Sequence, residues 1–222
     1  VFLGILSVGT IAWMLPKDPT PQAGNPGFLQ NIGKVFTYPP AVAALVMAML
    51  YTAANECVTL VYGVWMQQSF ALNITSLGAT AMAIGVSELA GEILVTTFTD
   101  KIGKHRAITI GIIGNCLAAV CLVIFGRWIT GALVSLFLFY LTFEFTIVSG
   151  IPLMSEIMPS ARATMLASHM AILAIGRVIG DLLAPSLFTL GILPGISFNA
   201  LAAILFNVLA VLALTQVKLR PA

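Results

Sequence analysis

The segment T-T-F-T-D-K-I-G-K-H-R, residues 96–106, decides how the chain is organised. Asp100, Lys101, Lys104 and Arg106 carry charges here, in a chain of which only 8% of the residues are charged. Long apolar runs precede and follow the segment. A short charged segment between two such runs predicts a loop, at which the chain leaves one membrane span and enters the next.

The composition points to the same class of protein. Of the 222 residues, 59% are hydrophobic, and the mean hydropathy is +1.05. A soluble domain is about half apolar and about a quarter charged, so these few charges could not cover a water-exposed surface. The net charge of +2 gives no indication of a nucleic-acid partner. We therefore expect an all-α, polytopic helical membrane protein.

Several apolar runs are long enough to cross a bilayer, which takes about 20 residues. The predicted spans are 40–66, 76–99, 107–126, 130–154, 164–190 and 197–217. They make residues 40–217 a six-helix transmembrane bundle. Because the connectors are short, we expect successive helices to be antiparallel neighbours.

The flanking segments have separate predictions. Residues 1–15 are apolar but too short to span, which predicts the tail of a preceding helix and a chain that is a piece of a longer protein. Residues 16–39 form a proline-containing cytoplasmic linker, in which apolar residues at helical spacing from Phe28 to Phe36 predict either a short interfacial helix or an ordered loop. Residues 218–222 are a predicted cytoplasmic tail.

Positive charge sets the predicted orientation. If the 16–39 linker is cytoplasmic and the spans alternate, only Arg127 of the loop cations falls outside. This satisfies the positive-inside rule and predicts a cytoplasmic C-terminus in the plasma membrane or bacterial inner membrane. The cations predicted to lie inside are Lys17, Lys34, Lys101, Lys104, Arg106, Arg162, Lys218 and Arg220.

Ionisable residues within the spans are the candidates for function. Each costs about 2.5–3.5 kcal/mol at mid-depth, so the chain keeps them only where they pair or face a polar cavity. A carboxylate beside aromatic rings, such as Glu144, could take up and release a proton near neutral pH; one held neutral by a hydrogen bond would serve structure only. The predicted substrate and proton cavity comprises Thr52, Asn55, Glu56, Thr59, Tyr140 and Glu144.

A second set of charges, in other spans, either fixes helix packing or serves gating or coupling. Glu88 and Glu92 lie one turn apart and repel each other, so at least one is neutral or paired. Arg177 can pair locally with Asp181, which would fix packing, or reach an acid on another helix, which would suit gating or coupling. Two ridges of small residues suit close helix packing. They are Gly176, Gly180 and Ala184, and Gly111, Gly114 and Ala118.

Other classes of site find no support in the sequence. His105 and His169 are too few and too far apart for a metal site, and the three cysteines lie in apolar runs as small core residues. An intramembrane enzyme would need a nucleophile beside a base, and no such pair is visible. We expect no cofactor, no metal and no enzymatic activity.

Three stretches resemble motifs of the major facilitator superfamily. Residues 100–106, D-K-I-G-K-H-R, resemble its signature loop, and Thr96 in place of the usual glycine fits the weaker copy between the eighth and ninth helices. Residues 155–163 resemble the loop before the eleventh helix, and G-R-x-x-G at 176–180 is similar to that helix in the drug:proton antiporter branch. The matching loop residues are Asp100, Lys101, Gly103, Lys104, Arg106, Glu156, Pro159 and Arg162.

This resemblance implies the C-terminal half of a transporter, from the end of helix six to helix twelve. In the family, two six-helix bundles rock about a midplane site. The implied partners are therefore the N-terminal bundle, a small-molecule substrate, protons and membrane lipid. The resemblance would place Glu56 and Glu144 in the central cavity, and would place the second set of charges at the interface with the other half.

The resulting expectation is a proton-coupled secondary active transporter that exports small amphipathic molecules by alternating access. Two alternatives stay open. One is nutrient uptake, of a sugar or an organic acid, by the same fold; the other is a membrane scaffold subunit that transports nothing.

Overall fold

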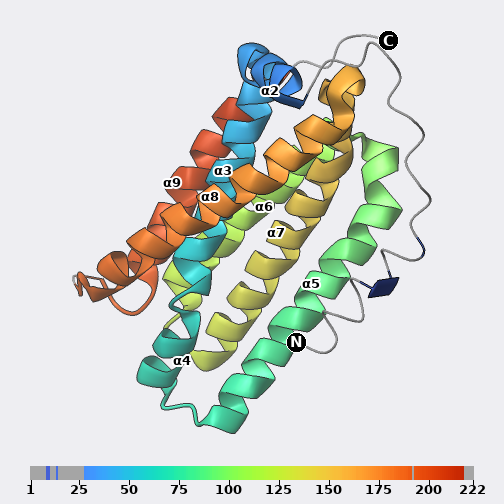
Figure 1. Cartoon of the computed structure of the whole chain (residues 1–222). Coiled ribbons are helices and arrows are strands. Elements are labelled where there is room, and N and C mark those ends of the chain that lie inside the picture. The colour runs from blue at the N-terminus through green and yellow to red at the C-terminus, as the bar shows by residue number, and fades with distance from the viewer. Residues whose placement is uncertain (1–8, 11–13, 15–27, 192, 218–222) are drawn as a thin grey trace.

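The computed structural model describes residues 9, 10, 14, 28–191 and 193–217. Most of the predicted preceding span, the linker up to residue 27 and the C-terminal tail therefore lie outside the described residues. The described helices form one all-α bundle (Figure 1). They are α2 (Phe28–Thr37), α3 (Pro39–Thr59), α4 (Tyr62–Phe70), α5 (Ile74–Ile102), α6 (Lys104–Phe125), α7 (Ile129–Ile157), the 3₁₀ turn η1 (Pro159–Ala161), α8 (Arg162–Thr189) and α9 (Ser197–Leu214).

Six helical segments in the described part of the chain are long and apolar enough to cross a membrane, which confirms the predicted polytopic bundle. Each matches one predicted span, with ends that differ by a few residues. The segments are Pro39–Phe70, Ile74–Ile102, Lys104–Phe125, Ile129–Ile157, Pro159–Thr189 and Ser197–Leu214.

The charged segment 96–106 is not a loop, and this prediction is wrong. Helix α5 continues through Asp100 and Lys101, and α6 begins at Lys104, so Gly103 alone joins the two helices. Gly103 has φ +86°, a conformation that glycine adopts without strain. The charged side chains stay helical because they can reach water beyond the hydrocarbon, so a polar helix end resembles a loop in the sequence.

The first span is interrupted, whereas the sequence predicts one continuous helix over 40–66. Pro39 and Pro40 open α3 at the positions where proline is tolerated. The helix ends at Thr59, and α4 begins at Tyr62 and carries the span on to Phe70. Interruptions inside a membrane occur where the backbone is buried in protein or lines a cavity.

Neighbours in sequence are not always neighbours in space. The central helix α3 packs against α8 and α9, while α5 stands to one side and packs against α7 (Figure 1). The expectation that successive helices pack together is therefore wrong for α3 and α5. The ridge on α8 explains the α3 contact, because a Cβ on Gly176 or Gly180 would collide with the backbone oxygen of Met49 or Ala53.

Buried asparagines fasten α9 to the other helices. Asn207 donates from Nδ2 to Oδ1 of Asn115 on α6 over 2.7 Å, and Asn115 donates in turn to the Phe139 oxygen on α7 over 2.7 Å. Nearer the other end, Asn199 donates to the Cys57 oxygen on α3 over 2.8 Å. Such hydrogen bonds hold helices together where apolar packing alone gives little specificity.

The segment before the first span, for which the sequence leaves a short interfacial helix or an ordered loop open, contains helix α2. It is helical, and it packs against α3 and α8 with Val35 buried and Lys34 exposed. It lies at the same end of the bundle as the α5–α6 and α7–α8 turns, and α4 lies at the opposite end (Figure 1). We call the first of these the α2 end.

Candidate functional site

Arg177 on α8 reaches across to another helix. Its Nε lies 3.4 Å from Oε1 of Glu56 on α3. The Glu56 side chain is 12% exposed and that of Arg177 is 58% exposed, so the pair has one side open. Within the described residues, Arg177 therefore pairs with an acid on a different helix rather than with Asp181 on its own. The packing of Gly180 against Glu56 Cβ brings the two helices close enough for this contact.

A chain of hydroxyl and amide groups runs beside Glu56. Asn55 donates from Nδ2 to Oγ1 of Thr59 over 3.1 Å, and the Tyr140 hydroxyl on α7 donates to the same oxygen over 3.1 Å. The Oδ1 atom of Asn55 is buried without a hydrogen-bond partner. The chain thus joins α3 to α7 just before the interruption of the first span. Thr52 stands apart, because it is buried and its hydroxyl donates to the Ala48 oxygen.

A cavity of about 310 Å³ lies between α7 and α8. Glu144 and Arg177 line it near the middle of their helices. Glu144 is half-buried, and no hydrogen bond or ion pair engages its carboxylate in the described part of the chain. The remaining walls are largely apolar and include Ile147, Ile151 and Leu173. The cavity therefore offers an unpaired acid and an ion-paired guanidinium to an otherwise apolar molecule.

His169 also lines this cavity, and the sequence analysis missed it. Its ring is fully buried, and Nε2 lies 3.3 Å from the Tyr51 hydroxyl on α3. Nδ1 is buried without a hydrogen-bond partner. In the sequence, His169 is a lone histidine near the end of a span, and only the arrangement of α8 beside α7 shows that it lines the cavity. A buried ring nitrogen without a partner is a costly group that a bound molecule could satisfy.

The acids of α5 face the same region. Glu88 and Glu92 are close enough to Glu144 to interact with it electrostatically, and so is Arg177. Asp181 interacts in the same way with Glu56. The acids nearer the middle of the described spans thus lie in the same region as Arg177. They are Glu56, Glu88, Glu92, Glu144 and Asp181. Like charges this close repel one another.

The residues of the predicted signature loop lie at the α2 end and divide into two groups. Lys104 forms an ion pair with Glu156 on α7, and Arg162 donates from Nε to the Ser155 oxygen over 3.2 Å. The ion pair joins the α5–α6 turn to the end of α7, and the Arg162 hydrogen bond closes the α7–α8 turn. Asp100 and Lys101 are exposed, and neither takes part in an ion pair within the described residues. Pro159 opens the short turn η1 before α8.

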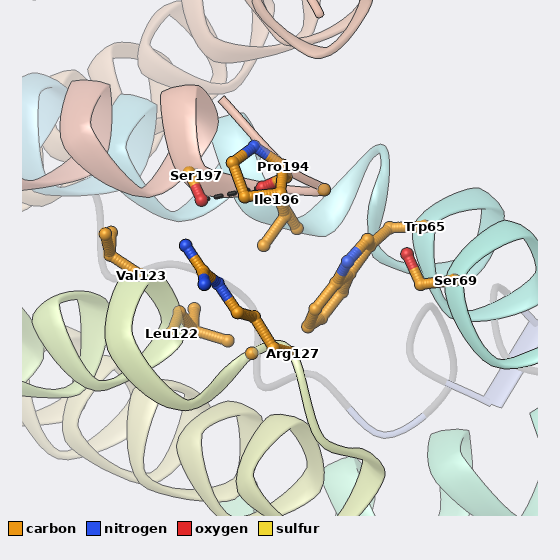
Figure 2. A pocket seen from close by; sticks show the side chains of 10 residues that line it. Trp65, Ser69, Leu122, Val123, Arg127, Pro194, Ile196 and Ser197 are labelled. Atoms are coloured by element: carbon orange, nitrogen blue, oxygen red, sulfur yellow. Dashed lines mark hydrogen bonds between the residues drawn. The ribbon is translucent and has the colours of Figure 1, made fainter. Parts of the chain in front are cut away.

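A smaller pocket of about 70 Å³ lies at the opposite end of the bundle. Figure 2 shows Arg127 extending between the end of α6 and the segment before α9, with Trp65 on the other side. Gly195, at φ +60°, packs against the indole ring, where a Cβ would collide. The pocket contains none of the predicted site residues and no acid. It is a small gap in the packing between the turns at this end of the bundle.

No group of three or more His, Cys, Asp or Glu side chains converges on a possible metal position within the described residues. Cys57 is buried, and Cys116 and Cys121 are partly buried; all are free thiols. The α7–α8 cavity combines ionisable side chains with apolar walls, which suits a small molecule that has polar and apolar parts. That places it among polytopic membrane proteins with a polar site inside the bundle.

The comparisons with known proteins name the family. Residues 1–181 match the family model of the Major Facilitator Superfamily, so the chain belongs to this superfamily of transporters. It is also similar to the uncharacterized MFS-type transporter YceJ of Bacillus subtilis (strain 168), with 23% identity over 178 residues. That match covers 77% of this chain and 43% of the relative, so the chain spans less than half of the length of the relative.

Proposed function

We propose that this chain is the C-terminal half of a proton-coupled secondary active transporter that exports small amphipathic molecules by alternating access. The observation that carries the proposal is the α7–α8 cavity, where the unpaired carboxylate of Glu144 lies with the ion-paired Arg177. Membership of the superfamily supports transport itself. The drug:proton antiporter branch is the narrower part of the proposal.

In this mechanism, a proton and the substrate compete for Glu144. The ionised carboxylate attracts Arg177 and the polar or cationic group of a substrate, and protonation removes that attraction. Arg177 then has two acids within its region, Glu56 and Glu144, and shifts toward whichever is ionised. The apolar walls of the cavity accept the apolar part of the substrate. His169 supplies a hydrogen-bonding nitrogen farther along the same cavity.

A complete transporter needs a second bundle in this proposal. Two bundles that rock about a midplane site would enclose the α7–α8 cavity, with Glu88, Glu92 and Asp181 near their interface. The cations at the α2 end make it the cytoplasmic end by the positive-inside rule, in the plasma membrane or bacterial inner membrane, with the C-terminus on that side. The described ones are Lys34, Lys101, Lys104, Arg106 and Arg162.

Substitution of the two carboxylates tests the proton coupling. In the full protein, reconstituted into liposomes, Glu144→Gln should abolish transport driven by a pH gradient but keep exchange of labelled for unlabelled substrate. The exchange reaction is the internal control, because it needs binding and rocking but no net proton movement. Glu56→Gln should reduce gradient-driven transport as well, because it removes the partner of Arg177. Normal gradient-driven transport by both variants would exclude these acids as the proton carriers.

The direction of transport and the scaffold alternative are tested in the same preparation. In everted membrane vesicles an exporter accumulates substrate, whereas in right-side-out vesicles it does not. Accumulation only in right-side-out vesicles would favour uptake. A correctly inserted wild-type protein with neither transport nor exchange of any of a panel of amphipathic compounds and nutrients would favour a scaffold.

A further inference from the structure

An apolar groove runs along the outside of the bundle, on a different side from the acid cluster. It is about 400 Å³ in volume, and α5, α6 and α7 line it. Leu94, Phe98 and Ile102 follow one another along α5 at one-turn spacing. Leu94 comes two residues after Glu92, so the groove and the acids occupy different sides of α5.

The floor of the groove is α7, which keeps the two sites separate. Leu141 and Phe145 line the groove, while Glu144 and Ile147 line the α7–α8 cavity. The groove exists because α5 and α6 separate from their junction at Gly103 while both pack on α7. Gly111 and Gly114 on α6, which also line it, leave the wall without bulky side chains.

No polar group in the groove needs a partner. Thr142 is the one polar side chain among the lining residues, and its hydroxyl donates to the Leu138 oxygen over 2.7 Å. The occupant of such a groove must therefore be a hydrocarbon chain or an apolar surface.

Two cations stand where the groove meets the α2 end. Lys101 lies over the Phe98 ring, with Nζ 5.9 Å from the ring centroid, and Phe98 itself lines the groove. Arg106 precedes the lining residue Ile110 by one turn of α6, so it lies on the same face of that helix. Both cations are exposed, and neither takes part in an ion pair within the described residues. Lys104, which lies between them in the sequence, forms an ion pair with Glu156.

The length of the groove agrees with one leaflet of a bilayer. From Leu94 to Ile102, at 1.5 Å per residue, α5 rises about 12 Å. Half of the hydrocarbon core of a bilayer is about 15 Å thick. A chain that begins at the cations would therefore end near the middle of the membrane.

We propose that this groove, with Lys101 and Arg106, is a binding site for an anionic glycerophospholipid. One acyl chain lies along Leu94, Phe98 and Ile102, and the headgroup phosphate lies between the two cations. The charge complementarity commits the site to an anionic lipid, because basic residues beside a cleft between membrane helices favour such headgroups. The site does not depend on the proposed transport cycle.

Native mass spectrometry of the full protein tests whether Lys101 and Arg106 select an anionic headgroup. The protein is held in mild detergent, and either dioleoyl phosphatidylglycerol or dioleoyl phosphatidylcholine is added. The wild type should prefer phosphatidylglycerol by on the order of tenfold, since each cation near a headgroup strengthens binding severalfold. Lys101→Gln with Arg106→Gln should remove this preference. Lys34→Gln with Arg127→Gln is the matched control, because it also removes two exposed cations and should keep the preference.

A second variant tests the groove. Leu94→Trp should fill it and reduce the bound lipid of either headgroup, whereas Leu117→Trp, on an exposed part of α6 outside the groove, should not. The proposal is overturned if the Lys101 and Arg106 variant keeps the preference, or if Leu94→Trp binds as much lipid as the wild type. It is also overturned if the full protein binds no lipid here, which would mean that another part of the longer protein covers the groove.

Discussion

Arg177 illustrates how one residue connects the helices of the site. It lies near the middle of its span, where its guanidinium contacts Glu56 on α3 and lines the cavity that also contains Glu144 on α7. An unpaired arginine at this depth would be costly, and so would an unpaired Glu56 that is 12% exposed. The pair is therefore stabilised by the attraction between the two charges and also by the high cost of leaving either charge unpaired inside the membrane.

Removal of the Arg177 guanidinium should lower the stability of the protein mainly because it leaves the Glu56 carboxylate without its partner. Arg177→Gln should destabilise the full protein by about 1–2 kcal/mol, less than for a fully buried pair because the arginine side chain is largely exposed. Thermal unfolding in detergent would measure this. Adding Glu56→Gln should recover part of the loss, because no buried charge is then left alone. A double variant no more stable than Arg177→Gln would show that the pair does not act as a unit.

At the scale of helices, small residues determine which elements meet. Gly176 and Gly180 let α8 cross α3 at backbone contact, which places Arg177 against Glu56 and His169 against Tyr51. Between α6 and α7, Gly111 and Gly114 leave room for side chains of α7, since a Cβ on either would meet Thr146 or Thr142. The glycines of α8 thus position polar groups both beside them, as for Arg177, and farther along the helix, as for His169.

Two glycine-to-alanine substitutions should distinguish the effect of close packing on stability from the effect of helix propensity. Gly180→Ala should destabilise the protein, because the new Cβ would lie 2.6 Å from both the Ala53 oxygen and Glu56 Cβ. We expect a cost of about 1–3 kcal/mol, the range for overpacking a core. Gly85→Ala is the matched control: it is also in a span helix but has open space around it, and should be neutral or stabilising by up to about 1 kcal/mol. Equal unfolding temperatures for the two variants would contradict the packing argument.

At the scale of the whole molecule, the alternation of the spans fixes which turns share a side of the membrane. The α2 end carries α2, the α5–α6 turn, the α7–α8 turn and the end of α9 (Figure 1). The opposite end carries α4 and the pocket around Arg127 (Figure 2). The cations Lys34, Lys101, Lys104, Arg106 and Arg162 lie at the α2 end, whereas Arg127 lies at the opposite end, and the proposed orientation follows from this difference.

Labelling with a membrane-impermeant thiol reagent should confirm that orientation in intact cells. In the full protein with Cys57, Cys116 and Cys121 replaced by alanine, Lys34→Cys should be labelled only after permeabilisation, whereas Arg127→Cys should be labelled without it. Both side chains are exposed in the structure, so access differs only by the side of the membrane. The reverse pattern would place the α2 end outside.

The sequence predicted the membrane class, the six spans and the set of charged residues inside them. It predicted the charged segment around Gly103 as a loop, because a charged helix end and a charged loop have the same composition. It left the partner of Arg177 open, since spacing along one helix allows a local pair with Asp181 as readily as a contact across helices. The cavity role of His169 was not predicted, because a lone histidine gives no sign of the helix that will pack beside it.

Hydropathy and charge along the chain thus determined by themselves that the protein crosses a membrane, and where. Both depend only on transfer between water and hydrocarbon, which each segment experiences independently of the others. Which helices meet was decided only in the tertiary structure, where glycines bring α8 onto α3 and asparagines fasten α9 to its neighbours. Close packing and buried hydrogen bonds depend on the shapes of both surfaces, and no local pattern in the sequence specifies the second surface.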